Sequence, residues 1–374
     1  MGPWKAFSMV VILGAGFGHT GGATANSGRH ESKALLVKLP PVETASRSGL
    51  TRTKADFGLL ACRFPNRRRV YRNCPPPIPC WLPPISSLPP TNRPDSVSLR
   101  WKFTVKKAFY AHIASEVVQK MKVMGMEVTQ NQSPHIWTRW TPERIDPKGN
   151  WVLAVKVLGT KLDVDIGGNK VSSENNPIGE VFKRAEFKVV LAPNLSIVEI
   201  LGQEEYIRKE AGAYRQLELF LRSHFGEGAV KQMGEHIFQA VPERPVSKGD
   251  HWLRKNVHAS GPSMGTYKTA NKYTYEGQQG QVDHIKVESS LTYLTPKEQR
   301  GLPFQVEGTL KSPKDSSSGT VWFNRALGRV VRAVYYVRVE GTLGVDIGGL
   351  KTIVEMNVDQ KTTVEITDTN PLDK

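Results

Sequence analysis

One stretch of this sequence occurs twice, about 181 residues apart. Residues 162–170 read LDVDIGGNK, and residues 343–351 read LGVDIGGLK. A Gly-Thr pair precedes both copies, beginning at Gly159 and at Gly341. Repetition of this kind indicates a duplicated structural unit. The sequence therefore predicts two similar units, each with a strand that ends in a Gly-Gly hairpin turn.

Alternation of apolar and polar residues predicts strands through most of the chain after about residue 97. Leu99, Trp101, Phe103 and Val105, for example, alternate with polar residues. Strands that are joined by short turns form antiparallel sheets. Residues 203–240 instead carry apolar side chains at helical spacing, which predicts at least two helices. The fold is expected to be mainly β (α+β), with two similar curved antiparallel sheet units and a central helical segment.

The N-terminus has the pattern of a secretory signal peptide. Lys5 precedes an apolar run at residues 6–17, and an A-x-A cleavage pattern stands at residues 23–25. The run is too short to cross a bilayer, so the mature chain is expected to have no transmembrane helix. An alternative is a dinucleotide loop at residues 14–19, but histidine occupies the position of its last glycine. The signal predicts export to the periplasm or the extracellular space.

Residues 26–95 are rich in proline and arginine and have no periodicity. Residues 1–95 hold 13 of the 25 prolines and all three cysteines, with 13 Lys+Arg against 4 Asp+Glu. Such composition is typical of disorder. Cys74 and Cys80 are candidates for a small disulfide loop, in which Cys62 would take no part. A start codon assigned too far upstream is the alternative explanation for this segment.

The changes in composition and periodicity divide the chain into five parts. Basic and acidic residues are interspersed after residue 95, so the net charge of +16 does not predict nucleic-acid binding. The expected parts are a signal peptide at 1–25, a disordered Pro/Arg-rich segment at 26–95, a first β unit at 96–202, a helical segment at 203–242 and a second β unit at 243–374.

The sequence contains no recognisable catalytic or metal-binding motif. Asp163 and Asp165 would share one face of a strand and could form a metal-binding pair, but a polar strand face that leads into a hairpin is the favoured explanation. The histidines lack the spacing of a zinc site, and no nucleophile elbow or phosphate loop is present. No metal, no cofactor and no enzymatic activity are therefore expected.

Tryptophan and methionine recur at alternate positions of the predicted strands. Such side chains suit either a close-packed core or a sheet face that binds an apolar ligand. As ligand-binding candidates the sequence offers Trp101, Met121, Val123, Trp137, Trp151 and Trp252.

Several short sequence segments resemble those of a family of uncharacterised exported bacterial proteins, a domain of unknown function. The resemblance covers about residues 97–372 and implies no activity. It lies in residues 99–103, 121–130, 163–168, 248–252, 265–268 and 360–364. The expected arrangement of curved sheet and helices is also similar, at the level of the fold, to the half-barrel of bacterial lipoprotein carriers.

Three functions are compatible with this sequence. The first is non-catalytic binding of an apolar or lipid-like ligand in the curved sheet. The second is an envelope scaffold or protein-interaction role without a small-molecule ligand. The third is hydrolysis by a site without a known signature. A ligand cavity would distinguish the first from the second, and a convergent His/Asp/Ser group in a cleft would favour the third. The oligomeric state is not predicted.

Overall fold

The computed structural model describes residues 95–172, 177–259, 265–295, 305–347 and 349–373. These residues belong to one compact unit. The predicted signal peptide, nearly all of the Pro/Arg-rich segment and the candidate disulfide of Cys74 and Cys80 lie outside the described residues.

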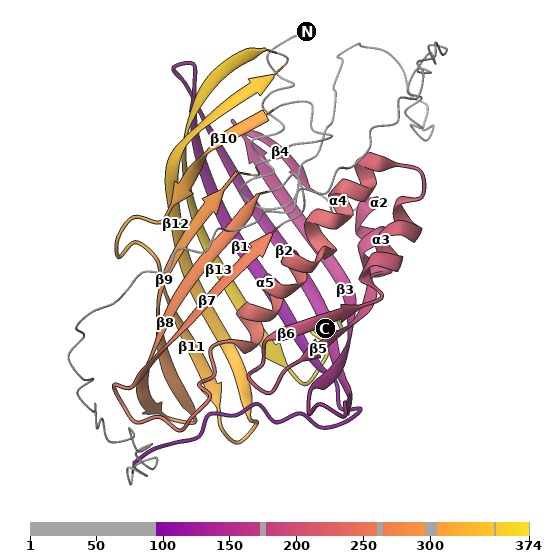
Figure 1. Ribbon diagram of the computed structural model, residues 1–374, viewed down its shortest axis with the longest axis vertical. Coiled ribbons are helices and arrows are strands. Elements are labelled where there is room, and N and C mark those ends of the chain that lie inside the picture. The colour runs from indigo at the N-terminus through magenta and orange to yellow at the C-terminus, as the bar shows by residue number, and fades with distance from the viewer. Residues whose placement is uncertain (1–94, 173–176, 260–264, 296–304, 348, 374) are drawn as a thin grey trace, which may run out of the picture. The chain divides into compact units, whose positions relative to one another are not determined.

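Long antiparallel strands dominate the described part of the chain, which confirms the mainly β fold (Figure 1). The strands are β1 (Phe109–Val123), β2 (Met126–Ile145), β3 (Trp151–Ile166), β4 (Asn169–Ser172), β5 (Glu186–Leu191), β6 (Ile197–Leu201), β7 (His251–Ala259), β8 (Thr266–Gln279), β9 (Val282–Leu294), β10 (Gln305–Lys311), β11 (Ser318–Asn324), β12 (Arg329–Ile347) and β13 (Leu350–Thr367). The helices are α2 (Pro177–Lys183), α3 (Gln203–Ala211), α4 (Arg215–Phe225) and α5 (Glu227–Phe238).

All of these strands form one sheet, in the order β6-β5-β3-β2-β1-β13-β12-β10-β9-β8-β7, with β4 beside β3 and β11 beside β9 and β12. The prediction of two separate sheet units is therefore corrected. The two halves of the sequence do occupy the two halves of the sheet, but β1 pairs with β13 along most of its length and joins them. A strand edge left open exposes unpaired N–H and C=O groups, and this pairing satisfies the facing edges of β1 and β13. The predicted boundaries between the five parts of the chain stay predictions.

The repeated stretch forms the same hairpin in both places, while an internal duplication is not confirmed. Gly167 and Gly168 join β3 to β4, and both have positive φ. Gly349 has positive φ between β12 and β13, and Gly348 lies outside the described residues. The Gly168 N–H donates to Asp165 Oδ1 and the Gly349 N–H donates to Asp346 Oδ1, each at 2.8 Å. The shared sequence thus specifies a turn.

The strand predicted around Leu99–Val105 does not form. This segment has no ladder partner. Leu99, Trp101 and Phe103 nevertheless pack into the core, whereas Val105 is exposed. Individual contacts hold it: the Lys102 N–H donates to Gly328 O, and Lys102 Nζ donates to Arg325 O at 3.1 Å. Alternation reports burial of one side of the chain, and a core can supply that burial without a neighbouring strand.

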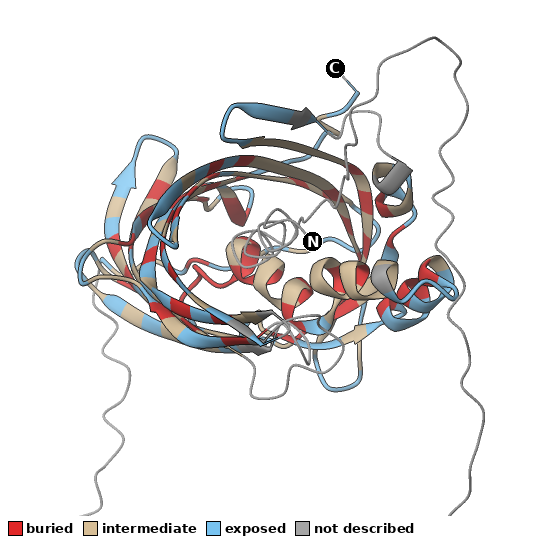
Figure 2. Cartoon of the chain, turned by 90° about the horizontal axis from the view of Figure 1, so that it is seen from above, coloured by how far each residue is buried: buried red, intermediate tan, exposed pale blue. Residues whose placement is uncertain are grey.

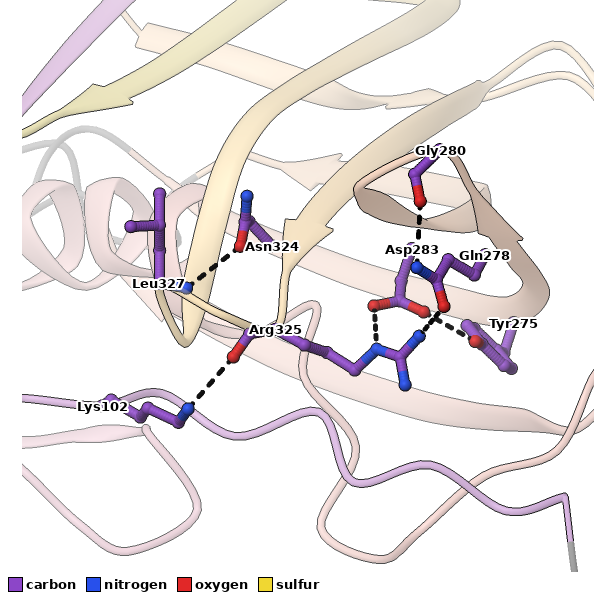
Figure 3. A network of polar contacts seen from close by, with 8 residues as sticks. All are labelled: Lys102, Tyr275, Gln278, Gly280, Asp283, Asn324, Arg325 and Leu327. Atoms are coloured by element: carbon purple, nitrogen blue, oxygen red, sulfur yellow. Dashed lines mark hydrogen bonds and ion pairs between the residues drawn. The ribbon is translucent and has the colours of Figure 1, made fainter.

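A buried carboxylate, that of Asp283, belongs to a polar network that reaches the segment with Lys102 (Figure 3). Asp283 of β9 is 1% exposed and accepts hydrogen bonds from Arg325 Nε and from the Tyr275 hydroxyl, each at 2.7 Å. Arg325 also donates to Gln278 of the β8–β9 hairpin. Burial and the bond to Asp283 raise the pKa of Tyr275 to about 12, so the phenol remains a donor. The network joins two hairpins to the segment that contains Lys102.

The predicted helices in residues 203–240 are confirmed as α3, α4 and α5, with a break at Gly226. The helix α5 lies on the concave side of the sheet (Figure 2). Its Phe238 ring lies 5.0 Å from that of Trp101 and 5.3 Å from that of Trp140, measured between ring centroids. Aromatic pairs at these distances and tilted angles contribute beyond the burial of their area.

Candidate functional site

The concave face of the sheet carries two apolar clusters that differ in what covers them. One cluster, here called the helix-covered core, includes side chains of α5 together with residues such as Phe109 and Trp140. The other contains side chains of strands alone, and no helix in the described ranges contributes to it. We call this second set the strand-only cluster. Its buried members are Val117, Met121, Tyr293, Val306, Leu310, Val339, Leu343, Val345, Val354, Met356 and Val358.

Strand register explains why these residues share one face. Side chains alternate between the two faces of a strand, and paired residues of neighbouring strands point to the same side. Met121 of β1 pairs with Val128 of β2 and with Met356 of β13, and Met356 pairs with Gly341 of β12. Continued across β10 and β9, the same register produces one apolar surface.

A band of glutamines lies on the concave face of β1 and β2, beside the strand-only cluster. We call Gln119, Gln130 and Gln132 the glutamine band; all three are buried. Gln119 pairs with Gln130, and Gln132 stands opposite Val117. The Gln119 amide nitrogen donates to Met121 Sδ at 3.2 Å and to Met356 Sδ at 3.7 Å. The band therefore borders the strand-only cluster directly.

The concave face carries no charged side chain in this region. Between Ser115 and Val123, the inward positions of β1 and the positions that pair with them in β2 and β13 are all apolar or neutral. Ion pairs occupy the opposite face instead, such as that between Glu116 and Lys361 at 3.1 Å. Burial raises the pKa of Tyr267 to about 12, so this phenol at the edge of the cluster is neutral too.

The six ligand-binding candidates lie in three places. Three of them pack against the helix-covered core: Trp101, Trp151 and Trp252. Met121 and Val123 belong to the strand-only cluster. Trp137 lies on the opposite, convex face, where its ring stacks on that of His112 at 4.7 Å. The structure brings Met121 and Val123 together on the apolar face, and a role of the six in binding stays a prediction.

Sequence reasoning missed the glutamine band. The signal was present, because Gln130 and Gln132 occupy the same alternating positions as Val128. A polar residue at a position that the strand period assigns to the interior is uncommon, because a buried amide needs a partner. The burial of both side chains, 0% and 1% exposed, makes these positions unusual.

A second polar group lies on the convex face. His112 Nε2 and His135 Nδ1 form a hydrogen bond of 3.1 Å, and Glu365 lies 3.9 Å from His112 Nδ1. Burial lowers the pKa of both histidines, His112 further through His135 and His135 further through Lys161. Within the described ranges no three His, Cys, Asp or Glu side chains are placed to hold a metal ion.

The predicted aspartate pair of the first hairpin has structural partners. Asp165 accepts from the turn, and Asp163 Oδ1 accepts from the Ser172 hydroxyl at 2.6 Å. Both carboxylates therefore serve the hairpin. Among the described helices, none combines the length and the apolar character needed to cross a membrane.

The middle of the chain matches a known protein family. Residues 152–323 match DUF6263, a family of unknown function. This confirms the resemblance to an uncharacterised family over those residues, which run from β3 to β11. An exported, bacterial character of the family stays a prediction. No curated protein sequence matches the chain.

Solved structures with similar strand arrangements are distant. A structure described as "Lipid-protein interactions in lipovitellin" is 8% identical with a TM-score of 0.38, over 72% of this chain and 26% of that one. The chain thus spans about a quarter of that protein. DynF from the dynemicin biosynthesis pathway of Micromonospora chersina is 7% identical with a TM-score of 0.18, over 71% of this chain and 83% of its own. A putative outer membrane lipoprotein-sorting protein domain from Vibrio parahaemolyticus is 9% identical with a TM-score of 0.11, over 67% of this chain and 84% of its own. These scores are low, and nothing about the function of this chain is inferred from them.

Proposed function

We propose that this protein binds an apolar or lipid-like ligand on the concave face of its sheet and catalyses no reaction. One observation supports the proposal most directly. The strand-only cluster gathers buried apolar side chains on one face of one sheet, and no helix from the described residues is among its members. A sheet that serves only as scaffold normally buries such a face against a second layer. Sites for small apolar ligands are lined predominantly by such side chains.

The distribution of charge supports the same function. Concave side chains of β1, β2 and β13 are uncharged beside the strand-only cluster, and the convex face carries the ion pairs. An apolar ligand on the concave face would therefore meet no unpaired charge, whose burial would be costly. Export, which we propose from the N-terminal pattern, would bring the protein to envelope or extracellular lipids.

Native mass spectrometry of the full chain, purified from the cells that produce it, tests the proposal first. We expect a retained ligand of lipid mass. A titration with 1-aminoanthracene, a neutral apolar fluorophore, provides the second test, and saturable binding near micromolar concentration is expected.

A charged substitution in the strand-only cluster should weaken this binding. Val337 of β12 packs at the strand-only cluster, whereas the neighbouring Tyr336 points to the exposed side. We expect Val337→Lys to weaken binding of 1-aminoanthracene at least about tenfold, because the ammonium must stay in the apolar face or displace the probe. The matched control Tyr336→Lys should bind as the wild type does. Absence of a retained lipid together with absence of saturable binding would favour the scaffold function.

A further inference from the structure

The glutamine band contains hydrogen-bonding groups for which the described residues provide no partner. In Gln130 and Gln132, both the amide nitrogen and the amide oxygen are buried without a hydrogen bond. Buried polar groups are nearly always paired, and each exception needs an explanation such as a missing ligand or water. Four such atoms on two neighbouring side chains of one strand face indicate a position for a polar group that the chain itself does not supply.

This position lies at the boundary of the apolar surface. Gln130 pairs across the sheet with Gln119, whose amide already donates to Met121 and Met356 of the strand-only cluster. Apolar side chains then continue along β12 from Val337 to Val345, a distance of about 26 Å at about 3.3 Å per residue. A molecule with its polar end at the band could therefore extend an apolar chain over the cluster.

The band selects the chemistry of the polar end. An amide offers two donors and one acceptor oxygen, so it matches a group that both donates and accepts, such as a hydroxyl. The surrounding inward positions hold no cation to neutralise a carboxylate or phosphate and no anion to neutralise an amine. Burying an ionised group there would leave its charge without a partner.

We propose that the ligand is an amphiphile with a neutral, hydroxyl-bearing head, of the monoacylglycerol or long-chain alcohol class. Its head lies at Gln130 and Gln132, and its hydrocarbon chain lies along the strand-only cluster. This inference rests on the proposed function and specifies the class of ligand.

Displacement of 1-aminoanthracene from the full chain at pH 8 separates the ligand classes. Four molecules with one chain length are compared: monooleoylglycerol, oleyl alcohol, oleate and oleylamine. We expect the two neutral hydroxyl compounds to displace the probe at concentrations at least about tenfold lower than the two ionised compounds do, because a buried unpaired charge is costly.

Two variants and one control assign the preference to the band. Gln130→Leu combined with Gln132→Leu should weaken monooleoylglycerol binding about tenfold while 1-aminoanthracene still binds, because only the head loses its hydrogen bonds. Gln130→Glu should improve binding of oleylamine relative to the wild type, a gain that misfolding cannot produce. Asn131→Leu alters the exposed residue between the two glutamines and should change neither ligand.

The outcomes distinguish the two proposals. If the wild type fails to bind 1-aminoanthracene, the proposed function falls, and this inference falls with it. If the probe binds but oleate competes as well as monooleoylglycerol, the inference is overturned and the proposed function stands. Full affinity for monooleoylglycerol in the double leucine variant would overturn the inference in the same way.

Discussion

At the scale of single residues, buried polar groups of this protein differ in whether the described residues supply their hydrogen-bond partners. Asp283 is buried, yet its carboxylate has two strong donors, Arg325 and Tyr275. Gln130 and Gln132 are equally buried and have no partner among the described residues. The first arrangement stabilises the fold, because the cost of desolvation is offset by hydrogen bonds to charge. The second lowers stability until something binds there.

His224 gives the fold a specific dependence on pH. Burial against Phe182 and Phe220 lowers its pKa from 6.5 to about 4, although the hydrogen bond to Phe220 O raises it in part. Between these values the unfolded chain binds more protons than the folded one. The contribution of His224 is therefore complete above pH 6.5 and declines as the pH falls toward 4, by up to about 1.4 kcal/mol per pH unit.

We expect His224→Leu to flatten the decline in the free energy of unfolding between pH 6 and 4.5, as measured by urea denaturation. Phe220→Leu changes the same contact without removing a titratable group and should keep the wild-type slope. Equal slopes for wild type and His224→Leu would show that the imidazole does not lose its proton on folding.

At the scale of elements, the Gly-Gly turns specify the register of two hairpins, β3–β4 and β12–β13. Ile166 pairs with Asn169 across Gly167-Gly168, and Ile347 pairs with Leu350 in the second copy. A slip of one residue would move every apolar side chain of β3 or β12 to the other face. The turn glycines therefore determine which side of the sheet becomes the apolar surface. Met124 and Gly125 between β1 and β2 also have positive φ, a hairpin that the sequence pattern did not reveal.

Replacement of Gly167 and Gly168 by valine should lower the free energy of unfolding by about 2 kcal/mol or more, because β-branched residues are strained at positive φ. Gly344→Val is the matched control: its φ is not positive, and the nearest atom to an added Cβ is 3.9 Å away. Chemical denaturation measures both. Unchanged stability of the double valine variant would mean that these glycines do not form the primed turn.

At the scale of the whole described unit, β1 and β13 are the first and last strands along the chain, and their pairing joins the two halves into one sheet. Tyr110 pairs with Thr367, and Val123 pairs with Val354. The strand-only cluster extends across this seam, with members on both sides. Neither half of the sequence could therefore present the complete apolar surface alone.

Unfolding should consequently occur in one step. We expect a single calorimetric transition for the described unit, with equal calorimetric and van't Hoff enthalpies, because separation of the halves would break the seam and divide the apolar surface. The aspartate variant Val364→Asp at the seam should lower this transition as a whole. Two resolved transitions, only one of which moves in Val364→Asp, would show that the halves fold independently.

The sequence by itself determined the local features of this protein. The Gly-Gly turns, the helices after residue 203 and the mainly β fold all follow from backbone preferences and side-chain period, which act within a few residues. Tertiary structure alone decided the rest. The pairing of β1 with β13, the extended course of the segment from Leu99 and the placement of Trp137 on the convex face depend on contacts between residues far apart in sequence. The sequence marked Gln130 and Gln132 only as polar residues at interior positions. The structure buries both beside the strand-only cluster, and the proposal of a binding site depends on this burial, which is a property of the assembled fold.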